Sequence, residues 1–519
     1  MSDYLVPAQM TVQAAAAALR ARLELREGPS VEIKRTFYDT FDGLLREAGV
    51  SVRFQDGRLA LLERDSGAER AWTASAEPAR PLLAIELRDG PWRRALTAIV
   101  GVRALLAQVE IHSRVDGFDV LDAECKTVVR MTLEQHTVRA CTGRSAELGP
   151  RLTLAGVRGY EEAMRRVRDT VAHELRFQPA SRPLVDQALG AVGGAAGATS
   201  SKVRVSLRSQ QRAGEAVATV LTALREVIEA NLEGAIADID SEFLHDLRVS
   251  VRRSRAVLRQ CRVVFAPAEH GGAAHFRSEL RWCQQVTGDA RDLDVYVLEW
   301  GEYRAMLPAP MRRDLDPALK VLRRRRLVAH GEMVRALRSQ RALALRADWA
   351  SFLERLAGAP LKDRPAAVMP IGELAGERIE TMYKRMVKMG KAIDSSSPPQ
   401  DYHELRKKGK ELRYLLELFA IPLYSSSDEV EIVKAMIKSL KALQDVLGRH
   451  QDRVVQVAAL RSLRDEVSAL PGGPGALMAM GALVVALRSD EQAARDEFAQ
   501  RFAAFASRSQ RKLVKEMFG

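Results

Sequence analysis

The chain has few residues that could form disulfides, bind zinc or cross a membrane. Its 519 residues include four cysteines, Cys125, Cys141, Cys261 and Cys283, which lie far apart and form no CxxC pair. This spacing excludes a disulfide framework and a zinc site, and it predicts buried, reduced thiols. The longest apolar run, residues 476–487, has twelve residues. A membrane-spanning helix needs ~20 residues, so none is expected.

The N-terminal residues also lack the features of a signal peptide. They carry Asp3 and no basic segment ahead of an apolar core. We therefore expect a cytoplasmic protein with no membrane partner.

Positive charge is concentrated in the C-terminal part of the chain. The sequence has 80 Lys and Arg against 67 Asp and Glu, a formal net charge of +13. Residues 1–200 hold 27 basic and 26 acidic side chains, net +1, which leaves 53 and 41, net +12, for residues 201–519. A polyanionic partner is therefore expected to bind the C-terminal part.

Composition divides the chain into two halves. Residues 190–201 (GAVGGAAGATSS) have no charge and no periodicity and predict a flexible linker. Upstream, segments 31–38, 50–54, 59–62, 82–87 and 131–138 predict an antiparallel sheet with turns at Asp56-Gly57 and Asp116-Gly117, and helices are expected at 11–26 and 161–176. Downstream, apolar residues at helical spacing between prolines predict an all-helical domain at 202–519.

The helical half contains an internal repeat. The block His245-x-Leu247-Arg248-x3-Arg252-x2-Arg255 recurs 158 residues later as His403-x-Leu405-Arg406-x3-Lys410-x2-Arg413. A second block, Leu280-x3-Gln284-x-Val286-x-Gly288-x3-Asp292, recurs 160 residues later as Leu440-x3-Gln444-x-Val446-x-Gly448-x3-Asp452. We infer two helical bundles, at about 205–350 and 370–506, packed about a pseudo-twofold axis.

Each copy carries a column of basic residues at 3-4-3-4 spacing, which falls on one side of a helix. We call these columns the first stripe, which is His245, Arg248, Arg252, Arg255 and Arg259, and the second stripe, which is His403, Arg406, Lys410 and Arg413. No acid lies within either column, and the neighbouring column is apolar, so each stripe borders the buried side of its helix.

Like charges stacked along one helix repel, so we expect the two stripes to line a groove or pore that an anion occupies. The alternative is a solvated face neutralised by acids at i±4 and, for the two histidines, a structural hydrogen bond. Arg281 and Lys441 occupy matched positions in the second block and rank next as anion contacts. Gly288 and Gly448 are expected to shape helix ends. Asp292 and Asp452 are expected to cap a helix or hold a stripe arginine.

These blocks resemble the CHAD family, whose helical domains carry an H-x-L-R-x3-[RK]-x2-R signature in each of two halves. The resemblance covers residues 203–506. It implies a compact all-helical domain with a basic central surface that binds inorganic polyphosphate. This agrees with the stripes, because cations repeated along a helix face suit a chain of closely spaced phosphates.

Residues 1–189 resemble a CYTH domain, the triphosphate tunnel fold, through segments 37–40 (FYDT) and 44–54 (LLREAGVSVRF). The resemblance implies an α+β domain built on an antiparallel tunnel or barrel. The family's metal-holding E-x-E-x-K strand should end just before Tyr4, but the residues there do not contain it. Glu32-x-Lys34 lacks one carboxylate and belongs to a later strand, and Gln55, two residues after Arg53, stands where a second basic residue is usual. Since a metal-dependent triphosphatase needs at least two clustered carboxylates, we expect this domain to be inactive.

The expected function is therefore binding of inorganic polyphosphate, free or in granules, without catalytic residues, metal or cofactor. One alternative is a metal-dependent triphosphatase or polyphosphatase in the CYTH-like domain, with the helical domain supplying substrate. A second alternative is nucleic-acid binding, because a net charge of +12 also attracts DNA or RNA. Aromatic residues make up only 5%, and the sequence has no recognised groove-reading motif, which argues against this alternative.

Overall fold

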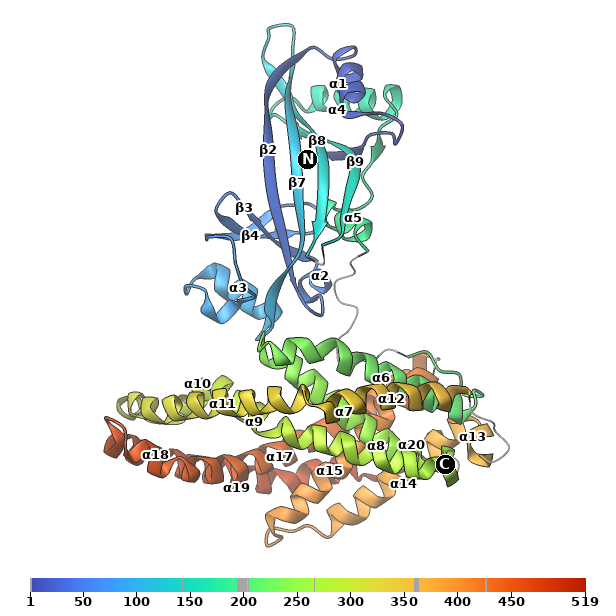
Figure 1. Cartoon of the computed structure of the whole chain (residues 1–519), viewed down its shortest axis with the longest axis vertical. Coiled ribbons are helices and arrows are strands. Elements are labelled where there is room, and N and C mark those ends of the chain that lie inside the picture. Colours follow the sequence, from blue (N-terminus) through green and yellow to red (C-terminus); the bar gives the residue numbers. More distant parts are fainter. Residues whose placement is uncertain are drawn as a thin grey trace. The chain divides into compact units, whose positions relative to one another are not determined.

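The chain forms two compact units, Met1–Ser200 and Ser201–Gly519 (Figure 1). The structure is a computed structural model that describes residues 2–141, 143–193, 203, 205–265, 267–358, 364–424 and 427–519. The linker predicted at 190–201 lies mostly outside these residues. Its first two residues, Gly190 and Ala191, complete helix α5 (Leu184–Ala191).

The first unit is an antiparallel sheet domain. Its ten-stranded sheet has the order β10-β1-β9-β8-β7-β2-β3-β4-β5, and β6 pairs with β7. Pairings among the described strands run from β10 to β5 without joining these two end strands, so they do not show the closed barrel that we expected. The strands are β1 (Ser2–Leu5), β2 (Leu25–Thr40), β3 (Val50–Gln55), β4 (Arg58–Glu63), β5 (Glu69–Ala74), β6 (Leu82–Leu83), β7 (Ala104–Leu121), β8 (Thr127–Ala140), β9 (Ser145–Gly156) and β10 (Gln178–Pro179).

Only one of the two predicted turns is correct. Asp56 and Gly57 connect β3 to β4 with φ angles of 47° and 75°. Two consecutive residues in the left-handed region suit a two-residue hairpin turn. The Asp116-Gly117 prediction is wrong, because β7 continues through both residues and pairs with β2 and β8 on its two sides.

The helices of this unit are α1 (Val12–Arg20), α2 (Leu44–Glu47), α3 (Pro91–Val100), α4 (Glu161–Asp169) and α5. The helix predicted at 11–26 is shorter, because Leu25 already pairs with Val120 at the start of β2. Segment 82–87 is a strand only at Leu82–Leu83 and then turns. Helices α1 and α4 lie together at one end of the long strands in Figure 1 and share a core with β8 and β9. Helix α5 packs on β7, β8 and β9.

The second unit is entirely helical among its described residues, apart from a single isolated bridge between Arg212 and Pro370. Its α-helices are α6 (Ala213–Ile236), α7 (Ser241–Gln260), α8 (Pro267–Val286), α9 (Gly288–Leu298), α10 (Trp300–Ala305), α11 (Asp316–Leu337), α12 (Gln340–Gly358), α13 (Pro365–Val368), α14 (Ile371–Lys391), α15 (Pro399–Leu415), α16 (Ile421–Leu423), α17 (Ser427–Ser462), α18 (Arg464–Ser468), α19 (Gly473–Phe505) and α20 (Arg508–Phe518). None of the described helices is long and apolar enough to cross a membrane.

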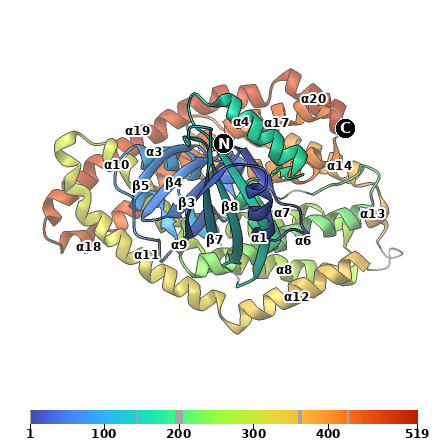
Figure 2. The ribbon, with the colours of Figure 1, turned by 90° about the horizontal axis from the view of Figure 1, so that it is seen from above.

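The two halves of the helical unit pack in the same order. Helix α7 packs on α6 and α8, and α9 packs on α11. In the second half, α15 packs on α14 and α17, and α17 packs on α19. Figure 2 shows α18 beside α11, at the end of the unit away from α13 and α20. The repeated blocks therefore fall on helices with matching neighbours.

The cysteine prediction is half correct. Cys261 and Cys283 are buried, and burial raises the pKa of both thiols, to about 12 and about 11. Cys125 and Cys141 are exposed, and all four are free. Cys125 lies in the short turn between β7 and β8 and has a φ of 60°. Its place in the turn keeps its side chain outside the core.

Candidate functional site

The stripes lie on two helices whose adjacent columns are buried. Helix α7 begins at a cap in which the Asp240 carboxylate accepts hydrogen bonds from the amides of Glu242 and Phe243. Helix α15 begins with Pro399 in its first turn, which suits the fixed φ of proline. The predicted apolar columns are confirmed as buried, and they are Leu244, Leu247, Val251, Ser254 and Leu258 on α7 and Tyr402, Leu405, Gly409, Leu412 and Leu416 on α15.

Ion pairs hold α7 in an antiparallel direction against α15 and the π-helical turn Leu416–Ala420 that continues it. Arg253 pairs with Glu417 of this turn at 2.6 Å, and Arg259 pairs with Glu411 of α15 at 2.5 Å. Rising residue numbers on α7 thus meet falling numbers on α15 and its continuation. The crossing brings Arg252 close enough to Lys410 to act on its charge. The two stripes therefore meet, one residue from each copy, at this crossing.

The first stripe leaves two arginines without an acidic partner. Among the described residues, Arg252 and Arg255 form no ion pair, and the Nε atom of each is buried without a hydrogen-bond partner. Besides Arg252, the charges that act on Arg255 are Arg259, Arg281 and Arg277, all of them positive. Burial, followed by this repulsion, lowers the pKa of Arg255. An anion in this cluster would relieve the repulsion.

Arg248 is held by neutral groups instead. Its Nη1 atom donates to the Gln284 carbonyl at 2.7 Å and to the Thr287 hydroxyl at 2.6 Å. The Gln284 side chain donates in return to the Arg248 carbonyl at 2.7 Å. Burial and the neighbouring Arg252 lower the pKa of Arg248 to about 10. Arg248 therefore joins α7 to the α8–α9 junction as well as carrying charge.

The second stripe lines an open pocket of about 380 Å³. Its other walls come from α17 and from the segment where α9 passes into α10. The lining residues are Glu299, Glu302, Arg406, Lys410, Arg413, Gln444, Asp445, Gly448, Arg449, Asp452, Arg453 and Gln456. The lining includes both positive and negative side chains, so this pocket is not the purely basic groove that the sequence predicted.

Most cations of the pocket have internal partners, but Lys410 does not. Arg406 pairs with Asp452 at 3.2 Å, and Arg413 pairs with Glu417 at 3.4 Å. Lys410 forms no ion pair or hydrogen bond among the described residues. Burial, followed by repulsion from Arg406 and Arg252, lowers the pKa of Lys410 to about 7. Its ammonium group is therefore only partly charged at neutral pH.

The expectation that no acid interrupts the stripes thus holds within each column but not in space. Glu411, Glu417 and Asp452 reach Arg259, Arg413 and Arg406 from other columns or helices. Arg281 is exposed on α8 near Arg255 and has no ion pair among the described residues. Lys441 is exposed on α17 and does not line the pocket.

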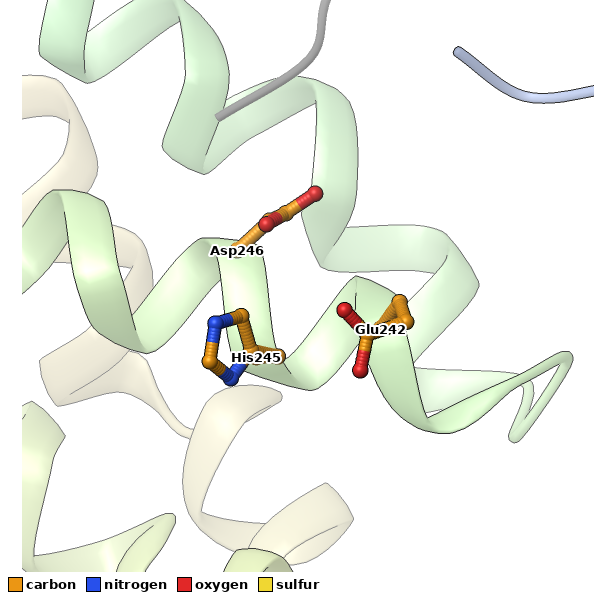
Figure 3. A group of neighbouring side chains, drawn as sticks. All are labelled: Glu242, His245 and Asp246. Atoms are coloured by element: carbon orange, nitrogen blue, oxygen red, sulfur yellow. The ribbon is translucent and has the colours of Figure 1, made fainter. Parts of the chain in front are cut away.

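The two histidines have different surroundings. His245 lies 3.0 Å from an Arg291 nitrogen, and that arginine lies 3.7 Å from Glu242. Figure 3 shows Glu242, His245 and Asp246, which come from the first turns of α7 and are close enough to one another to hold a metal ion. Arg291 already supplies a positive charge to this group. His403 is half-buried, and its Nδ1 atom has no hydrogen-bond partner among the described residues.

The glycines and aspartates of the second block lie close to the stripe arginines. Asp452 pairs with Arg406, which is one of the two roles expected for it. A Cβ on Gly448 would lie 3.6 Å from Arg406 Nη2 and 4.0 Å from Asp452, and a Cβ on Gly288 would lie 4.0 Å from Arg248 Nη1. These are ordinary van der Waals distances, so neither arginine requires a glycine there. Gly288 begins α9, but Gly448 lies inside α17, so the prediction of a helix end at Gly448 is wrong.

In the sheet unit, two neighbouring carboxylates that could hold a metal ion, Glu77 and Glu110, already pair with Lys34. Lys34 lies 3.0 Å from Glu77 and 3.5 Å from Glu110. Hydrogen bonds from Thr36 and Lys34 lower the pKa of Glu77, and the contacts with Glu77 and Glu110 raise the pKa of Lys34. The ammonium group of Lys34 therefore lies where a cation between the two carboxylates would be.

Comparison with known proteins identifies the helical unit. Residues 219–461 match the CHAD domain model, and both pairs of repeated blocks fall within them. The chain is similar to the crystal structure of the CHAD domain from the plant Ricinus communis, with 24% identity and a TM-score of 0.47 over 58% of this chain and 94% of that chain. It is also similar to PptA from Streptomyces chartreusis, with 19% identity and a TM-score of 0.42 over 56% of this chain and 99% of that chain. No curated protein matches the sequence significantly. The chain carries a CHAD domain at residues 219–461, inside its helical unit.

Proposed function

We propose that the helical unit binds inorganic polyphosphate, free or in granules, through its two basic stripes. The observation that carries this proposal is the group of cations without acidic partners around the α7–α15 crossing. Arg252, Arg255 and Arg281 come from the first copy and Lys410 from the second. The resemblance to CHAD domains implies the same ligand.

The arrangement suits a thin, flexible polyanion. Arg248 and Arg255 are seven residues apart on α7, a separation of roughly 10 Å along the helix axis. Each stripe lies next to the buried column of its helix. Its side chains are therefore at the edge of the buried face, where that helix meets its neighbours. A phosphate chain can enter such a space, whereas a stiff duplex contacts only a protruding surface. We therefore place the polyphosphate along α7 and across to Lys410.

The predicted contacts differ in how freely they can bind the anion. Arg252, Arg255, Arg281 and Lys410 are available without breaking an ion pair. Arg259, Arg406 and Arg413 must exchange an internal carboxylate for phosphate. Arg248, His245, His403 and Lys441 complete the proposed set and contribute less, because Arg248 and His245 have other partners and Lys441 lies outside the pocket.

Titration of the full chain with long-chain polyphosphate tests this proposal. We expect binding without added metal and an affinity that falls steeply as salt rises, since several phosphates would release counterions. The variant Arg252→Gln/Arg255→Gln/Lys410→Gln should lose most of the affinity. A control with the same charge change, Arg335→Gln/Arg464→Gln/Lys512→Gln, removes three largely exposed cations elsewhere.

Equal losses in the two triple variants would show only a general charge effect and would contradict a specific site. A competition between polyphosphate and duplex DNA separates the proposal from nucleic-acid binding. We expect polyphosphate to displace DNA at equal phosphate concentration. Displacement of polyphosphate by DNA would favour the nucleic-acid alternative.

For the sheet unit, we propose a CYTH-like domain without a metal site that serves as an accessory anion-binding or scaffolding module. Segment 37–40 closes β2, and Phe37 pairs with Arg53 in β3, so the two segments that carry the resemblance are neighbours in the sheet. Glu32 and Lys34 lie in β2 and not in the first strand. Lys34 also occupies the space between Glu77 and Glu110.

A further inference from the structure

Three titratable groups, Lys410 of the second stripe and two aspartates, lie close to stripe arginines. Lys410 projects from α15 into the pocket, and Asp452 faces it from α17. Asp292 is the residue of α9 that matches Asp452 in the repeat. Besides burial, the charge of Asp452 raises the pKa of Asp292, and both aspartates raise the pKa of Tyr296, so the two lie near each other. Each aspartate also interacts with the arginine of its own copy, Arg248 or Arg406. The three groups therefore share the place where the two copies meet.

The surroundings of Lys410 favour loss of its proton. Arg406 and Arg413 face it from α15 and Arg252 faces it from α7, while Asp452 is the acid that acts on it from α17. The pocket also contains Arg449 and Arg453, which pair with Glu497 and Asp490, and the carboxylates of Glu299, Glu302 and Asp445. Lys410 is thus crowded by guanidinium groups and has no ion pair among the described residues.

The surroundings of the two aspartates favour uptake of a proton. Surrounding protein atoms raise the pKa of Asp292 and Asp452. Stripe arginines oppose this shift, and Asp452 adds to it at Asp292. Lys410 thus loses a proton more readily than an ordinary lysine, and the two aspartates take one up more readily than an ordinary aspartate. The charge of this cluster therefore depends on pH more than the charge of ordinary Lys and Asp side chains does near neutrality.

We propose that Lys410, Asp292 and Asp452 make anion binding at the two stripes proton-linked, so that the site opens to polyphosphate when they are protonated and closes when they are not. This inference rests on the proposed function. Phosphate beside Lys410 stabilises the ammonium form, so binding takes up a proton where Lys410 is neutral in the free protein. The ionised aspartates, in turn, repel phosphate, and Asp452 competes with it for Arg406.

The sign of the effect follows from linkage. With a pKa of about 7 in the free site, Lys410 is mostly neutral above that pH. If one proton accompanies binding, the affinity falls about tenfold per pH unit above the free-site pKa until the bound-state pKa is reached. Internal phosphates of a long chain stay ionised over this range, so the ligand itself adds no such dependence.

The first measurement is the affinity of the full chain for long-chain polyphosphate between pH 6 and 9 at constant ionic strength. The second is the number of protons taken up on binding, which calorimetry gives when the titration is repeated in buffers of different ionisation enthalpy. Lys410→Arg keeps its charge throughout and should flatten the pH profile and abolish proton uptake near pH 8. Lys384→Arg, on an exposed lysine paired with Glu380, is the control and should keep the wild-type profile. Asp452→Asn should bind more tightly than wild type at neutral pH.

The outcomes distinguish the proton linkage from polyphosphate binding itself. Binding that does not change with pH, or an equal slope in wild type and Lys410→Arg, overturns the proton linkage and leaves polyphosphate binding intact. Weaker binding by Asp452→Asn overturns the role of the aspartates and makes Asp452 a positioning residue for Arg406. Absence of polyphosphate binding at every pH overturns the proposed function, and the proton linkage with it.

Discussion

At the scale of single residues, the partners of each cation decide how it can act. Arg252 and Arg255 have no acidic partner among the described residues, whereas Arg259 and Arg406 are paired with Glu411 and Asp452. A charge-assisted hydrogen bond contributes ~1.5–3 kcal/mol, and an internal pair that must first break offsets part of it. The stripes are therefore unequal along their length.

We predict that Arg255→Gln weakens polyphosphate binding by ~1.5–3 kcal/mol, and that Arg259→Gln weakens it less. The reason is that Arg259 gives up its bond to Glu411 when it binds phosphate. Isothermal titration of both variants measures the difference. An equal or larger loss in Arg259→Gln would contradict the account of unpaired cations.

Stability should separate Arg248 from the rest of its stripe. Arg248→Gln removes bonds to the Gln284 carbonyl and to Thr287, which is fully buried. We expect a loss of about 1–3 kcal/mol in the free energy of unfolding, because buried acceptors lose their donor. Arg255→Gln should hold or raise stability, because it relieves repulsion among like charges. Denaturant titration measures both, and equal effects would contradict this distinction.

The sequence predicted which residues form the stripes and offered Asp292 and Asp452 as acids that hold a stripe arginine, but not which arginine each acid reaches or that Glu411 and Glu417 reach others. Helical spacing places Arg248, Arg252 and Arg255 on one side of α7, and no tertiary information is needed. The pairing of Arg406 with Asp452 joins residues 46 positions apart and depends on how α15 packs on α17. One signal was present, because the glycine and the aspartate of the second block recur four residues apart in both copies, at nearly the same distance along the chain from the stripe arginine.

At the scale of elements, the repeat is a unit of two helix segments joined by an arginine. The stripe helix supplies the arginine, and the next segment supplies a glycine close to it and an aspartate that acts on its charge. Composition alone predicted a helix end at both glycines. Gly448 shows why this fails: a glycine within a helical pattern need not end the helix, and α17 continues through it.

Packing between α6 and α7 positions the first stripe. A Cβ on Gly234 of α6 would lie 2.2 Å from Phe243 at the start of α7. We predict that Gly234→Ala lowers the free energy of unfolding by about 1–3 kcal/mol, the usual cost of overpacking. Gly448→Ala is the control: its nearest contacts are 3.6 Å or more, so it should be neutral or stabilising. An unchanged free energy of unfolding in Gly234→Ala would contradict this prediction and show that α7 can move away from α6 without loss of stability.

At the scale of the whole molecule, the sequence predicted the division into a sheet domain and a helical domain more securely than the details of the sheet. The change from alternating to helical periodicity marks the two classes of structure. The sheet's closure was expected only from the resemblance, and pairings among the described strands do not show it. Turn composition misled at Asp116-Gly117, because long antiparallel strands tolerate glycine where no turn is needed.

We predict that the full chain hydrolyses neither ATP nor tripolyphosphate above a buffer control with Mg²⁺ or Mn²⁺. The ammonium group of Lys34 lies between the carboxylates of Glu77 and Glu110, where a metal ion held by these two residues would have to bind. A phosphate-release assay measures this directly. Turnover that a chelator and the change Glu77→Gln/Glu110→Gln both abolish would show that these carboxylates form a metal site.

A double-mutant cycle between the two stripes tests the central claim most directly. Its corners are wild type, Arg252→Gln/Arg255→Gln, Lys410→Gln, and the combination, each titrated with long-chain polyphosphate at one pH and salt concentration. If one chain contacts both stripes, the combined loss differs from the sum of the separate losses by at least about 0.5 kcal/mol, because each change alters how the other side holds the same ligand. Losses that add within error, or a combined variant that binds like wild type, would contradict a single site shared by the two copies.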